Sequence, residues 1–479
     1  MKPSVPPPDR RTALAAWYLC NDQRFLWNAP LLMWLCLCFH LFLLRSLSED
    51  AQANLRTSEL ELRALEPKSI PDADNAAGDY DRAHISFVAG TFDTQCRAQL
   101  AATGLPAEVE RVEVRSHLAA NAQALRDLLA AAQKRGCSWK WEYASGLPSS
   151  LPYESEFRLW RDLLSVQARV SAHQGNHAEA ARALRAIAAL ARHVNEAETC
   201  QDIRYATYIL EGQVETLEAI ILWDTPETKE QVAAYRDALW LESRSREWLQ
   251  RALEYERAKA LFVLDRVAAS GQIPRGWQVG VSSFRAFDYS PERRSVNEAM
   301  AEVLERVRRG ELLERGVAQE IYRKHKYGPA GIAQSVCWLP SLLQWELFNA
   351  EDRARVADAA LACLQFRLAR GRDPRSFDEL TPTFLPVIPH DVFHGQPLRF
   401  RHAPEGMTVC DFEAGTAKQY LKGLLVVYSL GADGTDDGGA DPATKPIGRG
   451  ERKPDDNFFR LPPLTSADRN RPSDQEFQP

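Results

Sequence analysis

The stretch FRLWRDLLSVQARVSAHQGNHAEAARALRAIAALARHV, residues 157–194, decides the fold class of this chain. Apolar residues recur every three or four positions on both sides of Gly175-Asn176, which is the spacing of a buried helical face. Glycine permits a tight turn between two such segments. The stretch therefore predicts two helices packed against each other. Their inward-facing residues are predicted to be Phe157, Trp160, Leu163, Leu164, Ala168 and Ala172, then Leu184, Ile187, Leu190 and Val194.

This pattern, with alanines at the start of the second helix, resembles a tetratricopeptide unit. Alanine there lets two helices approach closely. An array of such units needs at least three neighbours, and no second copy recurs at a period of about 34 residues. A helical bundle with one repeat-like hairpin is therefore the preferred interpretation, and the fold class is mainly α. Helical spacing also covers Ala107–Lys134, Ile203–Leu222, Lys229–Leu241, Arg244–Val267, Val296–Arg309, Glu311–His325 and Leu342–Ala369, with a helix start at Thr225-Pro226.

The composition excludes some classes of function. The 479 residues include 59 basic and 65 acidic ones, a net charge of −6, so no basic surface for nucleic acid is predicted. The sequence contains no G-x-S-x-G, H-E-x-x-H, Walker or G-x-G-x-x-G motif. Catalysis is therefore not predicted, although a hydrolase without a local motif remains an alternative.

An apolar run near the N-terminus predicts a membrane anchor. Phe25 to Leu44 contains only Asn28 and His40 as strongly polar residues, and a helix of this length spans about 30 Å, the thickness of a bilayer core. Basic residues gather before the run, which predicts a cytoplasmic N-terminus and an extracytoplasmic chain from Ser46 onward. The alternative is a signal peptide cleaved near residues 51–53, but the length of the apolar run favours the anchor.

The last quarter of the chain resembles the C-terminal part of major pseudopilins, pilin-like proteins of type II secretion. The resemblance implies a small α+β module in which Tyr428–Gly434 is the last strand and its loop. The processed pilin helix does not precede it, so the module is interpreted as borrowed. The resembling pieces, in the family's order, are Phe366–Pro374, Phe377–Leu380, Pro389–Leu398, Val427–Gly434 with Gly438-Gly439, and Asp455-Asp456 with Phe458-Phe459.

The acidic loop of this module is the one candidate metal site. Calcium prefers six to eight oxygen ligands on flexible backbone, and major pseudopilins bind calcium in the corresponding loop, which is what the resemblance implies here. The alternative is a turn whose carboxylates bond their own backbone. The candidate ligands are Asp433, Asp436, Asp437, Asp455 and Asp456.

Histidine and cysteine spacing predicts no other metal site. His173 and His177 stand four apart but straddle the Gly-Asn turn, so zinc is not predicted there. The nine cysteines lack metal spacing. Six follow the apolar run, where an oxidising compartment permits disulfides; buried free thiols are the favoured alternative.

Together these features predict a single-pass protein of the bacterial inner membrane, with the bulk of the chain periplasmic. The layout resembles large bacterial membrane-anchored proteins with a helical ectodomain and a pilin-like tail. The expected function is binding or scaffolding of other proteins; the alternative is an accessory part of a type II secretion system. The predicted segments are a cytoplasmic 1–24, a transmembrane 25–45, a stalk 46–80, a helical ectodomain 81–355, the C-terminal module 356–463 and a disordered tail 464–479.

Overall fold

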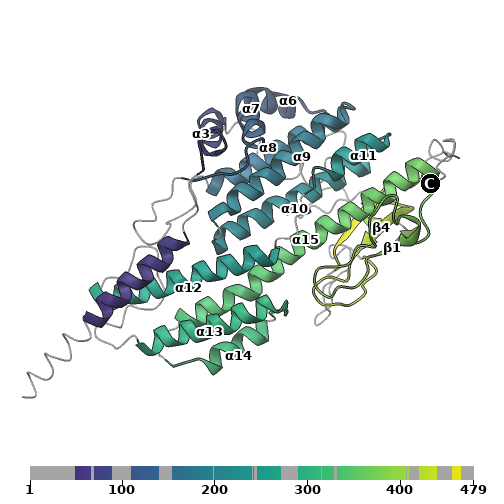
Figure 1. The fold of residues 1–479 in the computed structure, drawn as a ribbon. Coiled ribbons are helices and arrows are strands. Elements are labelled where there is room, and N and C mark those ends of the chain that lie inside the picture. The colour runs from purple at the N-terminus through teal and green to yellow at the C-terminus, as the bar shows by residue number, and fades with distance from the viewer. Residues whose placement is uncertain are drawn as a thin grey trace, which may run out of the picture.

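The computed structural model consists mainly of α-helices, with a small antiparallel sheet near the C-terminus (Figure 1). The predicted class, mainly α with a small α+β part, is confirmed at this level. The structure describes residues 49–65, 70–88, 109–139, 154–197, 199–239, 241, 245–270, 290–313, 315–327, 332–405, 407–408, 420–439 and 456–464.

The helices follow the predicted order along the chain. An unlabelled helix covers 49–64. The labelled α-helices are α3 Ala77–Ser86, α6 Val112–Ala120, α7 Ala122–Ala131, α8 Glu154–His173, α9 His177–Val194, α10 Cys200–Trp223, α11 Lys229–Arg236, α12 Ser245–Ser270, α13 Ser290–Arg308, α14 Arg315–Lys324 and α15 Ile332–Arg370. Short 3-10 turns are η2 Asn195–Ala197 and η4 Phe377–Glu379, and the strands are β1 Arg399–Ala403, β2 Met407–Thr408, β3 Tyr420–Leu421, β4 Leu424–Tyr428 and β5 Phe458–Leu461.

The α8–α9 hairpin forms as predicted. Gly175 adopts a positive φ of 77°, and the Asn176 side chain accepts a hydrogen bond from the backbone N–H of Glu179 at 3.2 Å. This bond satisfies one of the N–H groups that a helix start leaves without a partner. A Cβ at Gly175 would meet nothing within 4 Å, so backbone conformation rather than space selects glycine.

The hairpin has helical neighbours, as a repeat-like array requires. α8 packs against both α9 and α10, α9 packs against α10 and α11, and α10 and α11 both pack against α15. α10 and α11 thus form a second helical pair beside α8 and α9 (Figure 1). α15 packs against this second pair, as the first helix of a third pair would. The packing is consistent with a helical repeat, although the second pair carries no matching sequence pattern.

The start of α11 differs from the prediction. Thr228, not Thr225, caps the helix: its hydroxyl accepts the N–H of Gln231 at 3.2 Å, and the Gln231 side chain accepts the N–H of Thr228 at 3.1 Å. This capping box satisfies two N–H groups at once. The Thr225 hydroxyl instead donates to the carbonyl of Ile221 at 2.7 Å.

The helix predicted over Ala107–Lys134 is divided at Asn121. The buried Asn121 side chain accepts the N–H of Val88 at 2.8 Å and donates to its carbonyl at 3.1 Å. These two bonds fix the segment after α3 against the junction of α6 and α7, which explains why the long helix is interrupted there.

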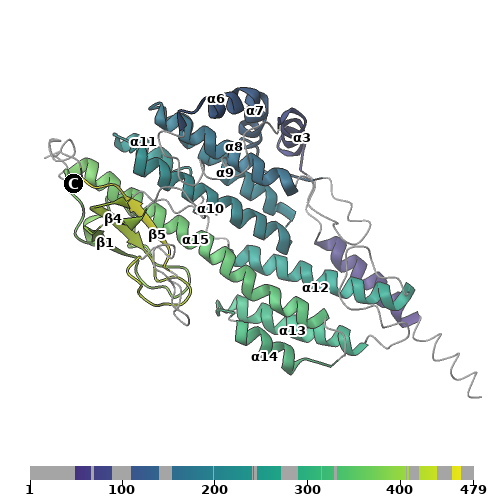
Figure 2. The ribbon, with the colours of Figure 1, turned by 180° about the vertical axis from the view of Figure 1, so that it is seen from behind.

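Residues 49–64 form a helix docked on the body, which corrects the expectation of a separate stalk over 46–80. Ser58 and Leu62 are buried, and Ser58 hydrogen-bonds to Asp265 of α12. Leu62 and Leu55 are seven residues apart and pack against the main core from one helical face. Figures 1 and 2 show this helix beside α12, at the end of the body that holds α13 and α14.

The sheet has the order β1-β4-β5, all antiparallel. Leu425 and Val427 of β4 face the main core, whereas Leu424 and Val426 pack with Leu222 at the end of α10. A strand covered on both faces is expected to be apolar throughout, and β4 is. Tyr428 therefore ends a central strand, and the expectation that it belongs to the last strand is wrong because β5 follows.

Other pieces of the C-terminal module have the expected local structure. The pilin-like helix exit coincides with the end of α15, after which Gly371 has a φ of 67°, and the next piece forms η4. Asp391 accepts the N–H groups of His394 at 2.5 Å and Gln396 at 2.6 Å, so it shapes the turn before β1. The predicted boundary at residue 356 lies inside α15, which packs against α12, α13 and α14 as well as against β4 and β5.

The predicted span Phe25–Leu44 and most of the predicted tail lie outside the described residues. Among the residues that are described, no helix is long and apolar enough to cross a membrane. Cys137, Cys200 and Cys363 are buried free thiols, which agrees with the favoured interpretation for these three. Their neighbours are helices of the core, where a thiol behaves as a small apolar group.

Candidate functional site on the face of α8, α10 and α15

One side of α10 carries polar and aromatic residues at intervals of three or four, while the residues between them are buried except Tyr205, which is half-buried. Neighbouring side chains of α8 and α15 extend this row, and we call the set the α10 face. Its members are Arg204, Tyr208, Glu211, Glu215 and Glu218 of α10, Arg158 and Arg161 of α8, and Leu342, Trp345, Glu346, Asn349 and Arg353 of α15.

Polar contacts join α10 to α15 and β5 at successive helical turns. Each contact pairs a side chain of α10 with one from a segment more than a hundred residues later, so the row depends on the tertiary fold. The contacts are Arg204 Nε with Glu346 Oε1 at 3.3 Å, Asn349 Nδ2 with Glu211 Oε1 at 3.2 Å, Arg353 Nη2 with Glu215 Oε1 at 3.4 Å, and Arg460 Nη2 with Glu218 Oε2 at 2.9 Å.

Tyr208 is the centre of a cation–π group on this face. The guanidinium carbons of Arg161 and Arg158 lie 4.0 Å and 5.0 Å from its ring centroid, and Arg158 Nε donates to its hydroxyl at 2.7 Å. Gly212 makes room for this group, because a Cβ there would lie 2.6 Å from Cδ of Arg161. A glycine inside a long helix costs about 0.5–1 kcal/mol relative to alanine, so Gly212 is a signal in the sequence that could have pointed to the site, although it was not used for the prediction.

Apolar side chains on the same face reach solvent. Leu342 and Trp345 of α15 are 45% and 42% exposed, one turn before Glu346 and Asn349. Tyrosine, tryptophan and arginine are the residue types that dominate the binding energy of protein interfaces. The face therefore has the composition of a protein-binding surface.

Two carboxylates of the α10 face, Glu211 and Glu346, are affected by burial. Burial raises the pKa of Glu211, with Arg353 acting against this shift, and burial likewise raises the pKa of Glu346 against the effect of Arg204. Glu346 Oε2 is buried and accepts no hydrogen bond from the described residues. A buried oxygen without a donor costs free energy, and a hydrogen bond to it would recover that cost.

The predicted acidic loop follows β4, and hydrogen bonds within the module engage its carboxylates. Asp433 accepts the N–H of Thr435 at 2.6 Å, and Asp436 accepts the N–H of Gly438 at 2.9 Å and pairs with Arg399. Asp456 accepts the N–H of Gly439 at 2.8 Å, and Asp437 also hydrogen-bonds to it through its backbone. These are the bonds of a carboxylate-supported turn.

The described part of the loop does not assemble a metal site. Across the described residues, no three His, Cys, Asp or Glu side chains gather in a way that could hold an ion, and Asp455 lies outside them. Burial, with help from the charges of Asp437 and Asp436, raises the pKa of Asp456 to about 6. Calcium binding stays a prediction, and an ion would have to displace Arg399 from Asp436.

The two histidines of the hairpin have separate partners. His173 Nδ1 lies 2.9 Å from Asp224 Oδ1, and this bond raises its pKa. His177 Nδ1 lies 2.8 Å from the hydroxyl of Tyr235, and burial lowers its pKa. The two rings therefore anchor α8 and α9 to the α10–α11 turn and to α11.

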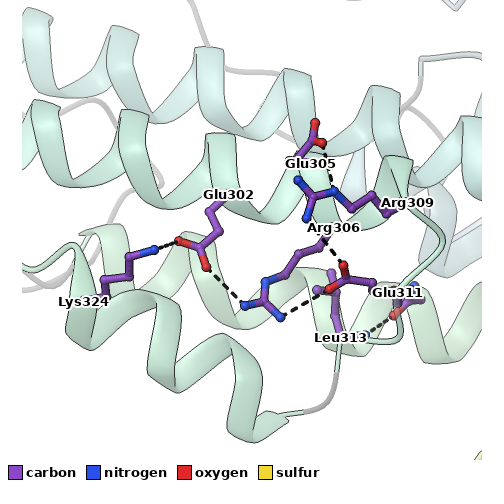
Figure 3. A network of polar contacts seen from close by, with 8 residues as sticks. Glu302, Glu305, Arg306, Arg309, Glu311, Leu313 and Lys324 are labelled. Carbon is purple, nitrogen blue, oxygen red and sulfur yellow. Dashed lines mark hydrogen bonds and ion pairs between the residues drawn. The ribbon is translucent and has the colours of Figure 1, made fainter.

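A charged hollow of about 330 Å³ lies between α13 and α14. Figure 3 shows that its acidic and basic side chains pair with one another: Glu302 binds Lys324 at 2.7 Å and Arg306 at 3.2 Å. Arg309 binds Glu305 at 3.0 Å. The charged groups neutralise each other, so they are better explained as ion pairs that hold α13 and α14 together than as a ligand site.

The buried carboxylate of Asp352, on α15, was not predicted from the sequence. It accepts the N–H of Val392 at 3.0 Å, the side-chain amide of Asn457 at 2.9 Å and the hydroxyl of Ser429. Burial raises its pKa even so. Its partners lie between 40 and 105 residues away, which local spacing does not reveal, and together they attach the sheet to α15.

Comparisons of the chain with family models, with curated protein sequences and with solved structures find no match. No relative therefore supplies an activity for these residues. The α10 face combines an exposed tryptophan, arginines and partly buried carboxylates, and it is the candidate functional site.

Proposed function

We propose that this protein is a membrane-anchored extracytoplasmic scaffold that binds another protein through the α10 face. The observation that carries the proposal is that α10 packs between α8 and α15, whose side chains place the Tyr208–Arg158 contact, the exposed Trp345 and the Arg204–Glu346 pair on neighbouring helices. Helices held side by side present such a surface without reorganisation, which reduces the entropy cost of binding.

Anchoring rests on the apolar run Phe25–Leu44 and on the basic residues before it. The orientation places the α10 face outside the cytoplasm. A reporter enzyme that is active only in the periplasm, fused after Pro479, is expected to be active. An inactive periplasmic fusion with an active cytoplasmic one would reverse the orientation.

Site-specific photocrosslinking tests the binding face. A photoreactive phenylalanine analogue replaces Trp345 in the full chain, and the matched control carries it at Val387, which is 68% exposed and lies outside the face. We expect a discrete protein adduct from position 345 and none from 387. Arg158→Glu is expected to reduce the adduct without lowering the melting temperature much. Identical patterns from both positions would remove the case for this face.

The alternative role is an accessory part of a type II secretion system, recruited through the C-terminal module. It is supported by the resemblance and by the arrangement of a long helix packed against a three-stranded antiparallel sheet. The same photoreactive residue separates the two roles, because recruitment through the module predicts adducts from Val387 rather than from Trp345.

A further inference from the structure

The end of the helical body nearest to the predicted anchor carries a basic and aromatic surface of its own. Segment 315–327 contains Arg315, Arg323, Lys324 and Lys326 against a single acidic residue, Glu320. Arg323, Lys324, Lys326 and Tyr327 are exposed. We propose that this surface, the C-terminal end of α14, binds the anionic phospholipid headgroups of the membrane that holds the anchor; the inference rests on the anchor proposed above.

Chain length places this surface close to the membrane. Four residues, 45–48, separate Leu44, the end of the apolar run, from Glu49, where the docked helix begins. The five steps from the Cα of Leu44 to the Cα of Glu49 reach at most about 18 Å even when fully extended. The helix 49–64 is fixed to the body, so the body cannot move far from the bilayer.

A series of contacts connects that helix to the end of α14. Ser58 hydrogen-bonds to Asp265, and Asp265 pairs with Arg293 at 3.1 Å. The next residue, Arg294, lies with its guanidinium carbon 4.5 Å from the ring centroid of Tyr327. Figures 1 and 2 both show the helix 49–64 at the end of the body that holds α13 and α14.

Some basic side chains at this end form no ion pair with a carboxylate of the described residues. Arg294 pairs with Glu298 at 2.7 Å and Lys324 with Glu302 at 2.7 Å. Arg323 and Lys326 make no ion pair with a carboxylate in the part of the chain that the structure describes; the Lys326 ammonium lies 5.9 Å from the ring centroid of Tyr322. Basic residues beside tyrosines are typical of surfaces at the headgroup level.

An environment-sensitive fluorescent amino acid at position 327 tests the contact in the full chain. The chain is reconstituted into vesicles of phosphatidylcholine, alone or with phosphatidylglycerol, that carry a headgroup-attached quencher. We expect quenching with phosphatidylglycerol that falls in phosphatidylcholine alone and at high salt, because salt screens exposed charges. The same residue at Val387 is the unquenched control.

Charge reversal identifies the residues responsible. Arg323→Glu with Lys326→Glu is expected to reduce quenching at 327 to the Val387 level, whereas Arg182→Glu with Arg185→Glu, on the exposed side of α9, leaves it unchanged. Flotation of the vesicles reports the anchor separately. A chain that does not float overturns the anchor and this contact together; a chain that floats without quenching at 327 overturns the contact alone, and equal quenching with and without phosphatidylglycerol overturns the role of anionic headgroups.

Discussion

At the scale of single residues, buried carboxylates make the stability of this protein depend on pH. Asp202 accepts the N–H of Thr199 at 3.0 Å in the capping box of α10, yet burial raises its pKa to about 7. Glu256 adds to the shift and Lys259 acts against it. The pKa of Asp202 in the folded chain therefore lies above its value of 3.8 in the unfolded chain. The contribution of protonated Asp202 to the free energy of unfolding is fully present below about pH 4 and is lost as the pH rises through 7.

Asp202→Asn keeps an oxygen for the Thr199 N–H but cannot ionise. Relative to this variant, the wild type is expected to lose about 1.4 kcal/mol of unfolding free energy per pH unit between pH 4 and 7. Denaturant unfolding of both chains across this range measures the difference. Parallel curves would show that Asp202 titrates as an ordinary carboxyl.

A second residue-level prediction concerns calcium. If Asp433, Asp436 and Asp437 bind the ion in the folded state, calcium at a hundred times its dissociation constant adds about 2.7 kcal/mol to the unfolding free energy. The melting temperature of the full chain is then higher in calcium than in chelator, and magnesium raises it less because it resists dehydration.

Asp433→Ala or Asp437→Ala is expected to abolish the calcium effect, whereas Asp237→Ala, at the exposed end of α11, preserves it. Equal melting temperatures of the wild type in calcium and in chelator would leave the loop as a hydrogen-bonded turn only.

Side chains whose partners lie nearby in the sequence had predictable roles, whereas side chains with remote partners did not. The turn-forming roles of Asn176 and Asp391 depend on neighbours within five residues. Both residues lie in segments that the sequence singled out, the Gly175-Asn176 turn and the resembling segment Pro389–Leu398. The partners of Asp352 and of Tyr208 come together only when helices pack. No spacing rule connects residues that far apart in the chain.

At the scale of elements, backbone conformation at the α8–α9 turn makes a directional prediction. Gly175→Ala forces alanine to a φ of 77° with no compensating contact, which costs about 1–2 kcal/mol. Gly316→Ala in α14 is the matched control: its Cβ also meets nothing, but the helical position gains about 0.5–1 kcal/mol. Thermal unfolding measures both variants. Melting temperatures that change in the same direction would contradict the claim that backbone conformation selects glycine at position 175.

The difference between local and remote partners also explains which elements were predictable. The helices from α8 to α15 were predictable from the spacing of apolar residues, because each segment itself contains the residues of its buried face. The start of α11 was misplaced because two candidate caps stand three residues apart and only the reciprocal bond of Thr228 with Gln231 decides between them. The helix 49–64 docks against the surface of α12. The polar composition of this segment does not indicate that contact.

At the scale of the whole molecule, α15 and the helix 49–64 connect parts that the sequence had suggested were separate. α15 belongs to both the helical body and the module, and most of its buried residues share one core cluster with β4 and β5. The helix 49–64 joins the body at the end nearest to the predicted anchor. If the predicted anchor spans a membrane, movement there is expected to reach the α10 face through packed helices.

Two leucines on the helix 49–64 test this connection. Leu62 is buried in the main core, whereas Leu60, on the same helix, is 68% exposed. Leu62→Ala is expected to lower the unfolding free energy by about 2–5 kcal/mol, the usual cost of emptying a buried leucine site. Leu60→Ala is expected to change it by less than about 0.5 kcal/mol. A stalk separate from the body predicts two small and equal effects, and denaturant titration of the two full-length variants decides between a docked helix and a stalk.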